Sequence, residues 1–280
     1  MDRPARLGYG MEAIPQGVSL RQHVARLYAK YQHPLLSLSG VLIFFALWEY
    51  IGTSGLIDPL FISSPTAILR AAVQMVQQGE IWNDLYVSGT EFSIGFLLAI
   101  VVGIPFGILY GWYRTFYYIF DPFVSAFNAT PRIALTPLFI IWFGIGLWSK
   151  VALVFLGAIF PLVLNTFSGV RTLDETLIRA ARSFGASDWQ IFRTVGLPGL
   201  VPFILSGLRV GLGHALIGIV VGELVAATAG IGYSMAIAGA TFQTDKLFVG
   251  ILIITGFGIL FTQALNRIER HFDAWRPQKN

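Results

Sequence analysis

The sequence contains no cysteine, which excludes a disulfide framework, a thiolate metal site and a cysteine nucleophile. Charge is also scarce, because 12% of the 280 residues are charged, whereas a soluble domain has about a quarter. Hydrophobic residues make up 55% of the chain, and the mean hydropathy is +0.68. This composition predicts a membrane protein.

Motifs of catalysis are missing as well. The four histidines are scattered without an H-E-x-x-H motif, and no G-x-S-x-G motif marks a serine nucleophile. The P-loop motif G-x-x-x-x-G-K-[ST] does not occur either, so ATP would have to be hydrolysed by a partner. We therefore expect no enzyme, and no metal or cofactor bound by this chain.

Long apolar runs dominate what is present. A spanning helix needs about 20 apolar residues, because it rises about 1.5 Å per residue through a hydrocarbon core about 30 Å thick. Six stretches qualify: 35–57, 92–112, 122–147, 151–170, 200–221 and 247–265. The third holds Pro131 and Pro137 with Arg132 between them, which predicts a break or kink. The predicted fold is an all-α polytopic membrane protein with six transmembrane helices.

The distribution of Lys and Arg predicts the orientation. One set of connecting segments, which includes both termini, holds 14 of these residues, whereas the opposite loops hold only Arg70, Lys150 and Lys246. The positive side of a membrane protein faces the cytoplasm, so both termini are expected there. In a membrane protein the location of Lys and Arg matters more than the net charge of +4, and we expect no nucleic-acid partner.

Two short helices are predicted outside the spans. Residues 1–34 would be a cytoplasmic tail that includes an amphipathic interfacial helix, and the first apolar run would stay as an uncleaved anchor. On the outer side, Ser64 would cap a helix that starts at Pro65 and has an apolar face with Ile68, Leu69 and Val73. Residues 35–280 would form one transmembrane domain.

Glycines recur at four-residue intervals in two spans, where small residues let helices approach closely in lipid. They are Gly103, Gly107 and Gly111 in one span, and Gly207, Gly211, Gly218 and Gly222 in the other. We expect ordinary close packing, with helices that slide against each other as the alternative.

The loop 171–199 is charged and contains residues that begin and end helices. Its four charges between residues 179 and 193 would cost on the order of 10 kcal/mol at a bilayer centre, so the loop stays in water. Residues 174–184 favour a helix, and Gly185 supplies the left-handed residue that ends one. Ser187 and Gln190 predict a capping box for a second helix, which Leu197–Pro198 would stop.

This loop resembles that of the inner-membrane permeases of binding-protein-dependent ABC importers. Their motif reads E-A-A-x3-G-x9-I-x-L-P. It is matched here by Arg179, Ala180, Ala181, Gly185, Val195, Leu197 and Pro198, with Arg179 in place of Glu and Val195 in place of Ile. The blocks RAARSFGAS, PRIALTPLFIIWFGIG, GLRVGLG and GELVAATAGIGY are similar to the branch that serves sulfonates, taurine, nitrate and bicarbonate. The resemblance covers nearly all of the chain after about residue 60.

The resemblance implies a type I ABC importer permease fold, with a coupling helix between spans four and five that docks on an ATPase subunit. The implied coupling residues are Arg179, Ala180, Ala181, Arg182, Gly185, Ala186, Ser187, Asp188, Leu197 and Pro198. The implied partners are two ABC ATPase subunits that bind ATP and Mg, a second permease copy, and a periplasmic or lipid-anchored solute-binding protein. The implied location is the bacterial inner membrane. The sequence does not decide between a homodimer and a heterodimer, nor between a small anion and a small heterocycle as cargo.

Polar residues inside spans are candidates for the translocation pathway. Arg132, beside Pro131, would give an anionic cargo an electropositive wall, or would instead snorkel or pair with Asp121. Arg209 would pair with a carboxylate or with carbonyls, or would line the pathway. Glu223 would form a gate or lie in the membrane interface.

An ion-coupled secondary transporter is the main alternative. It would show several acids near the membrane midplane and an inverted repeat. The candidate acids of the predicted spans are Glu49 and Glu223, both near span ends, and no inverted repeat is evident.

Overall fold

The computed structural model describes the backbone of residues 20–58 and 60–272, and every regular element in that part of the chain is helical. The helices are α1 (Leu20–Thr53), α2 (Pro65–Gln77), α3 (Glu80–Trp112), α4 (Arg114–Ala129), α5 (Thr136–Phe143), α6 (Leu147–Arg171), α7 (Glu175–Ser183), α8 (Asp188–Ile191), α9 (Leu197–Ala226), α10 (Ile231–Ala240) and α11 (Thr244–Phe272). A 3-10 turn (Arg132–Leu135) precedes α5, and a π-helical turn (Phe192–Gly196) precedes α9.

The predicted membrane architecture is confirmed. Five of the described helices are long and apolar enough to cross a membrane, and the number is six when the bent pair Arg114–Ala129 and Arg132–Phe143 is counted as one span. The pair bends by 91° at Thr130 and Pro131, which confirms the predicted break. The break occurs there because Pro131 lacks a backbone N–H and disfavours a helical conformation at Thr130, which is extended.

The predicted start of the second span is wrong. The helix α3 begins at Glu80, 12 residues before position 92, and it contains the buried acids Asp84 and Glu91. A search for apolar runs stops at such residues, because it cannot know that a carboxylate finds polar partners inside the bundle.

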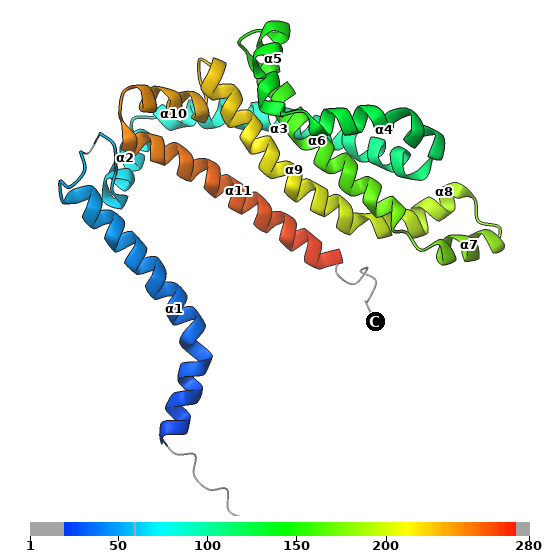
Figure 1. Ribbon diagram of the computed structural model, residues 1–280, viewed down its shortest axis with the longest axis horizontal. Coiled ribbons are helices and arrows are strands. Elements are labelled where there is room, and N and C mark those ends of the chain that lie inside the picture. The colour runs from blue at the N-terminus through cyan, green and yellow to red at the C-terminus, as the bar shows by residue number, and fades with distance from the viewer. Residues whose placement is uncertain (1–19, 59, 273–280) are drawn as a thin grey trace, which may run out of the picture.

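The helices α3, α6 and α9 form the core and lie side by side in Figure 1. The predicted glycines lie where these helices touch. A Cβ atom on Gly107 would lie 2.7 Å from Cβ of Thr166, and one on Gly218 would lie 2.7 Å from the carbonyl oxygen of Leu153. The glycines therefore serve close packing, as expected.

The bundle has two different ends (Figure 1). We call them the α10 end, which also carries α2, and the α7 end, which also carries α8. The helix α1 extends away from the α10 end, and its spanning part Leu35–Thr53 has no buried residue. It is held near its carboxyl end, where Trp48 Nε1 donates to the Ser63 carbonyl at 2.7 Å and Glu49 accepts two hydrogen bonds from Thr66.

The helix α2 starts as predicted, because Ser64 Oγ accepts a hydrogen bond from the Ala67 backbone N–H at 3.3 Å. Its predicted apolar face is wrong in part. Ile68 is buried with Ala71 and Met75, whereas Leu69 and Val73 are exposed.

The predicted interfacial helix stays a prediction. Residues 20–34 continue the helix α1 without a break, but their side chains, like residues 1–19, lie outside the described residues.

Candidate functional site

The first candidate site is the protrusion at the α7 end, where both termini of α7 are capped. The Thr176 backbone N–H donates to Asp174 Oδ1 at 2.7 Å, and this bond lowers the pKa of the exposed Asp174 carboxyl. At the other terminus Gly185 has φ +79°, so the Ala186 N–H donates to the Ala181 carbonyl and the Gly185 N–H donates to the Arg182 carbonyl. These two bonds make a Schellman motif, which fixes the direction in which the chain leaves α7.

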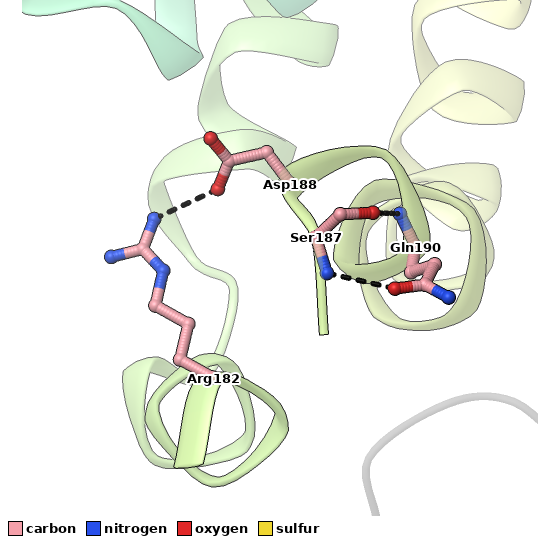
Figure 2. A network of polar contacts seen from close by, with 4 residues as sticks. All are labelled: Arg182, Ser187, Asp188 and Gln190. Carbon is pink, nitrogen blue, oxygen red and sulfur yellow. Dashed lines mark hydrogen bonds and ion pairs between the residues drawn. The ribbon is translucent and has the colours of Figure 1, made fainter. Parts of the chain in front are cut away.

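The turn after Gly185 is held by side chains (Figure 2). Ser187 Oγ accepts from the Gln190 backbone N–H at 3.3 Å, and Gln190 Oε1 accepts from the Ser187 N–H at 2.8 Å, which is the predicted capping box. Arg182 Nη2 donates to Asp188 Oδ1 at 3.2 Å across the turn. Arg182 and Asp188 therefore bond to each other in the free chain, which the sequence alone did not indicate.

Exposed apolar side chains surround this turn. Phe184 is 92% exposed and Trp189 is 69% exposed, and Leu177 on α7 is also exposed. The small residue Ala180 is exposed, whereas Ala181 is half-buried. Large apolar groups in water at the tip of a rigid protrusion are typical of a protein-docking surface. Phe184 and Trp189 were missed because a motif search weighs matching positions rather than exposure.

The prediction that Leu197–Pro198 stops the second helix is wrong. The helical path continues from Asp188 to Ala226, with Pro198 in the first turn of α9. The π-helical turn Phe192–Gly196 directly precedes it. A wider turn gives the proline ring room against the preceding carbonyl, so the helix continues although Pro198 donates no backbone hydrogen bond.

The second candidate site is a cavity of about 330 Å³ beside the break between α4 and α5. Arg132 lines it from the break and His214 from α9, together with Asn128, Thr130 and Thr136. Arg132 Nη2 donates to Asn128 Oδ1 at 3.0 Å, and its guanidinium lies 5.5 Å from the Phe160 ring centre. Pro131 is exposed next to Arg132 but does not line the cavity.

Arg209 lies elsewhere and is paired. Its Nη2 donates to Asn266 Oδ1 at 2.6 Å and forms an ion pair with Glu269, so it joins α9 to α11. Arg209 therefore pairs with a carboxylate between two helices, which is the first of the two interpretations given for it from the sequence. Asp121 accepts from the Tyr110 hydroxyl at 2.6 Å instead of pairing with Arg132.

Glu223 is buried within the bundle, 1% exposed, and does not line the cavity beside Arg132. It accepts hydrogen bonds from Ser88 Oγ at 2.6 Å and from the Gly232 backbone N–H at 2.5 Å. Asp84 accepts from the Gly230 backbone N–H at 2.9 Å and from the Ser234 hydroxyl. The two carboxylates thereby hold the amino terminus of α10 against α3 and α9.

Two further charged residues complete this buried cluster. Glu91 and Lys150 are 4% and 3% exposed, so both side chains are enclosed within the bundle. Lys150, predicted in an outer loop, lies in α6, so that prediction is wrong. The predicted set of acids within the spans is also wrong, because Asp84 and Glu91 lie in α3. No local signal shows that residues so distant in the sequence meet.

Comparisons with known proteins agree with this architecture. Residues 99–274 match the family model described as the binding-protein-dependent transport system inner membrane component. The chain is 34% identical over 271 residues to the taurine transport system permease protein TauC of Escherichia coli (strain K12), which covers 93% of this chain and 98% of that protein. It is 36% identical over 241 residues to the putative aliphatic sulfonates transport permease protein SsuC of Bacillus subtilis (strain 168), which covers 86% and 87%.

A solved structure shares the fold. The chain matches the structure titled inward facing conformations of the MetNI methionine ABC transporter with a TM-score of 0.55. The match covers 78% of this chain and 99% of the other, at 19% identity, so the likeness concerns the fold.

Proposed function

Because the chain belongs to the family of binding-protein-dependent transport system inner membrane components, the permeases of ABC importers, we propose that it imports a sulfonate-type solute. Two relatives that cover most of its length are named for taurine and for aliphatic sulfonates. The chain would form half of the channel, and a solute-binding protein outside the cell would deliver the cargo.

The observation that carries the coupling role is the rigid, exposed protrusion at α7. Its Schellman motif and capping box hold a fixed shape, and Phe184 and Trp189 present apolar surface that water solvates poorly. A groove on an ATPase subunit would bury these side chains, while Arg179 and other charged residues would make contacts at the rim. In this arrangement the α7 end faces the cytoplasm.

Transport would proceed by alternating access. Two ATPase subunits, which bind ATP and Mg, would close and draw the α7 protrusions of two permease copies together. This movement would open the channel outward, and hydrolysis would reverse it. The permeases would lie in the inner membrane with both termini in the cytoplasm.

The experiment is to purify the tagged full-length chain from its native membrane in mild detergent, identify the co-purifying proteins, and assay ATP hydrolysis. Uptake of radiolabelled taurine and butanesulfonate is then measured in cells with and without the gene. Recovery of an ABC ATPase and loss of sulfonate uptake on deletion are expected.

Two outcomes would contradict the proposal. If no ATPase co-purifies and uptake collapses with the ion gradient, the chain is a secondary transporter. If an ATPase co-purifies but sulfonate uptake survives deletion, the coupling holds and the cargo is of another class, such as a small heterocycle.

A further inference from the structure

The cavity beside Arg132 has the size and polarity of a small-molecule site. Its volume of about 330 Å³ lies within the range of roughly 300 to 1,000 Å³ for ligand pockets. Apolar residues of α6 and α9, such as Leu153 and Ile217, line one part. The polar part is formed at the break between α4 and α5, where Thr130 and Arg132 lie.

The charge of Arg132 has no neutralising partner among the described residues. None of the ion pairs in the described part of the chain includes Arg132. These pairs are Arg179–Glu175, Arg182–Asp188, Arg209–Glu269 and Lys246–Glu80. Arg132 has only the neutral amide of Asn128 and the face of Phe160, and its buried Nε atom has no acceptor. The contrast with Arg209 is direct, since both arginines lie within spanning segments and only Arg209 meets a carboxylate.

An uncompensated guanidinium within a span is costly in lipid, so the cavity must hold water, an anion or both. His214 also lines the cavity, and its ring is held by the backbone of α9. Its Nδ1 lies 3.0 Å from the Val210 carbonyl oxygen, which can only accept, so Nδ1 carries a proton that is directed at the backbone. Among the lining residues that the structure describes, Arg132 is the one arginine or lysine, and its guanidinium is always charged, so it is the group that attracts an anion.

We propose that this cavity is an anion-binding site on the translocation pathway, where Arg132 holds the anionic head of the solute as it passes. A guanidinium presents paired N–H donors that match the oxygens of an oxyanion such as a sulfonate. A single cation in an open cavity binds weakly, which suits a site that the solute must also leave. The inference rests on the proposed function for the identity of the solute, but not for its charge.

The absence of cysteine makes the test direct. Ile217→Cys places a single thiol in the cavity wall at a residue that is exposed in the free chain. The full complex in membrane vesicles is treated with an anionic reagent, sulfonatoethyl methanethiosulfonate, and with its cationic trimethylammonioethyl counterpart. The measured quantity is the ratio of the anionic to the cationic labelling rate.

Adding Arg132→Gln should lower this ratio by about tenfold, because the local field that favours the anion is lost. Arg132→Lys keeps the charge and should keep the ratio within about twofold. Arg267→Gln removes one charge from an exposed residue near the end of α11, does not line the cavity, and should leave the ratio unchanged. An excess of butanesulfonate should slow the anionic reagent when position 132 carries Arg or Lys, but not in Arg132→Gln.

An unchanged ratio in Arg132→Gln, with the complex present at normal levels, overturns the proposal. So does equal slowing by butanesulfonate in Arg132→Gln and in the chain that keeps Arg132. If Arg132→Gln does not assemble, the test is made in Arg132→Lys. Slowing of the anionic reagent by butanesulfonate in that variant supports the proposal, and the absence of slowing overturns it.

The results would differ if the cavity binds anions but the transported solute is not a sulfonate. The ratio would still fall in Arg132→Gln, and inorganic sulfate would still slow the anionic reagent. Sulfonate uptake in cells would nevertheless be independent of the gene.

Discussion

At the scale of single residues, Glu223 explains two of the three glycines of the stretch GELVAATAGIGY, Gly230 and Gly232. A Cβ atom on Gly230 would lie 2.5 Å from Cδ of Glu223, and one on Gly232 would lie 2.7 Å from its Cβ. The backbone of the turn before α10 therefore lies directly on the Glu223 side chain. This close approach lets one buried carboxylate accept a backbone N–H and the Ser88 hydroxyl at the same time.

Glu223→Ala should destabilise the protein, since it leaves two buried donors without an acceptor at about 1–3 kcal/mol each. Thermal unfolding of the purified protein in detergent measures the loss. Glu223→Gln keeps one carbonyl acceptor and is the matched control, with a smaller decrease in Tm. An alanine variant that unfolds at the wild-type temperature would show that the α10 turn does not depend on this carboxylate.

At the scale of elements, α7 and the turn after it form a unit whose shape is set locally. The cap at Asp174, the Schellman motif at Gly185 and the capping box at Ser187 lie within 17 residues, from 174 to 190. Because every one of these bonds is local, the direction of the turn is fixed within this segment.

Gly185→Val should uncouple the permease from its ATPase. A Cβ atom there meets nothing within 4 Å, so the cost comes from the backbone, because φ +79° is strained for a β-branched residue by about 1–3 kcal/mol. ATPase co-purification and solute uptake are expected to fall together.

Gly185→Asn is the matched control for this prediction, since Asn tolerates the left-handed conformation. It should keep both the recovered ATPase and the uptake near the wild-type levels. Wild-type uptake in the valine variant would refute the assignment of this turn to coupling.

At the scale of the whole molecule, the single chain exposes both a large apolar surface and a cavity that contains a charged side chain. The spanning part of α1 has no buried residue, and the cavity with the unpaired Arg132 opens beside exposed residues of α9. Lipid can cover the apolar surface but not an uncompensated cation. A second permease copy would enclose the cavity away from lipid.

We expect that second copy to be identical to the first. Two versions of the chain with different affinity tags, expressed together at native levels, should be recovered together through either tag. Mixing separately expressed membranes before solubilisation controls for association in detergent. Recovery of a different permease in place of the second tagged copy would indicate a heterodimer.

The sequence by itself determined several features that depend on residues close together in the chain. The apolar runs, the break at Pro131 and the caps of the α7 turn depend on composition, backbone geometry and hydrogen bonds that span a few residues. The tertiary structure decided which charges are buried and paired. Gly230 bonds to Asp84 across 146 positions, and Arg209 pairs with Glu269 while Arg132 finds no carboxylate among the described residues. Such pairing depends on how α3, α9, α10 and α11 pack, because a charge is tolerated inside the bundle only where distant segments supply its partners.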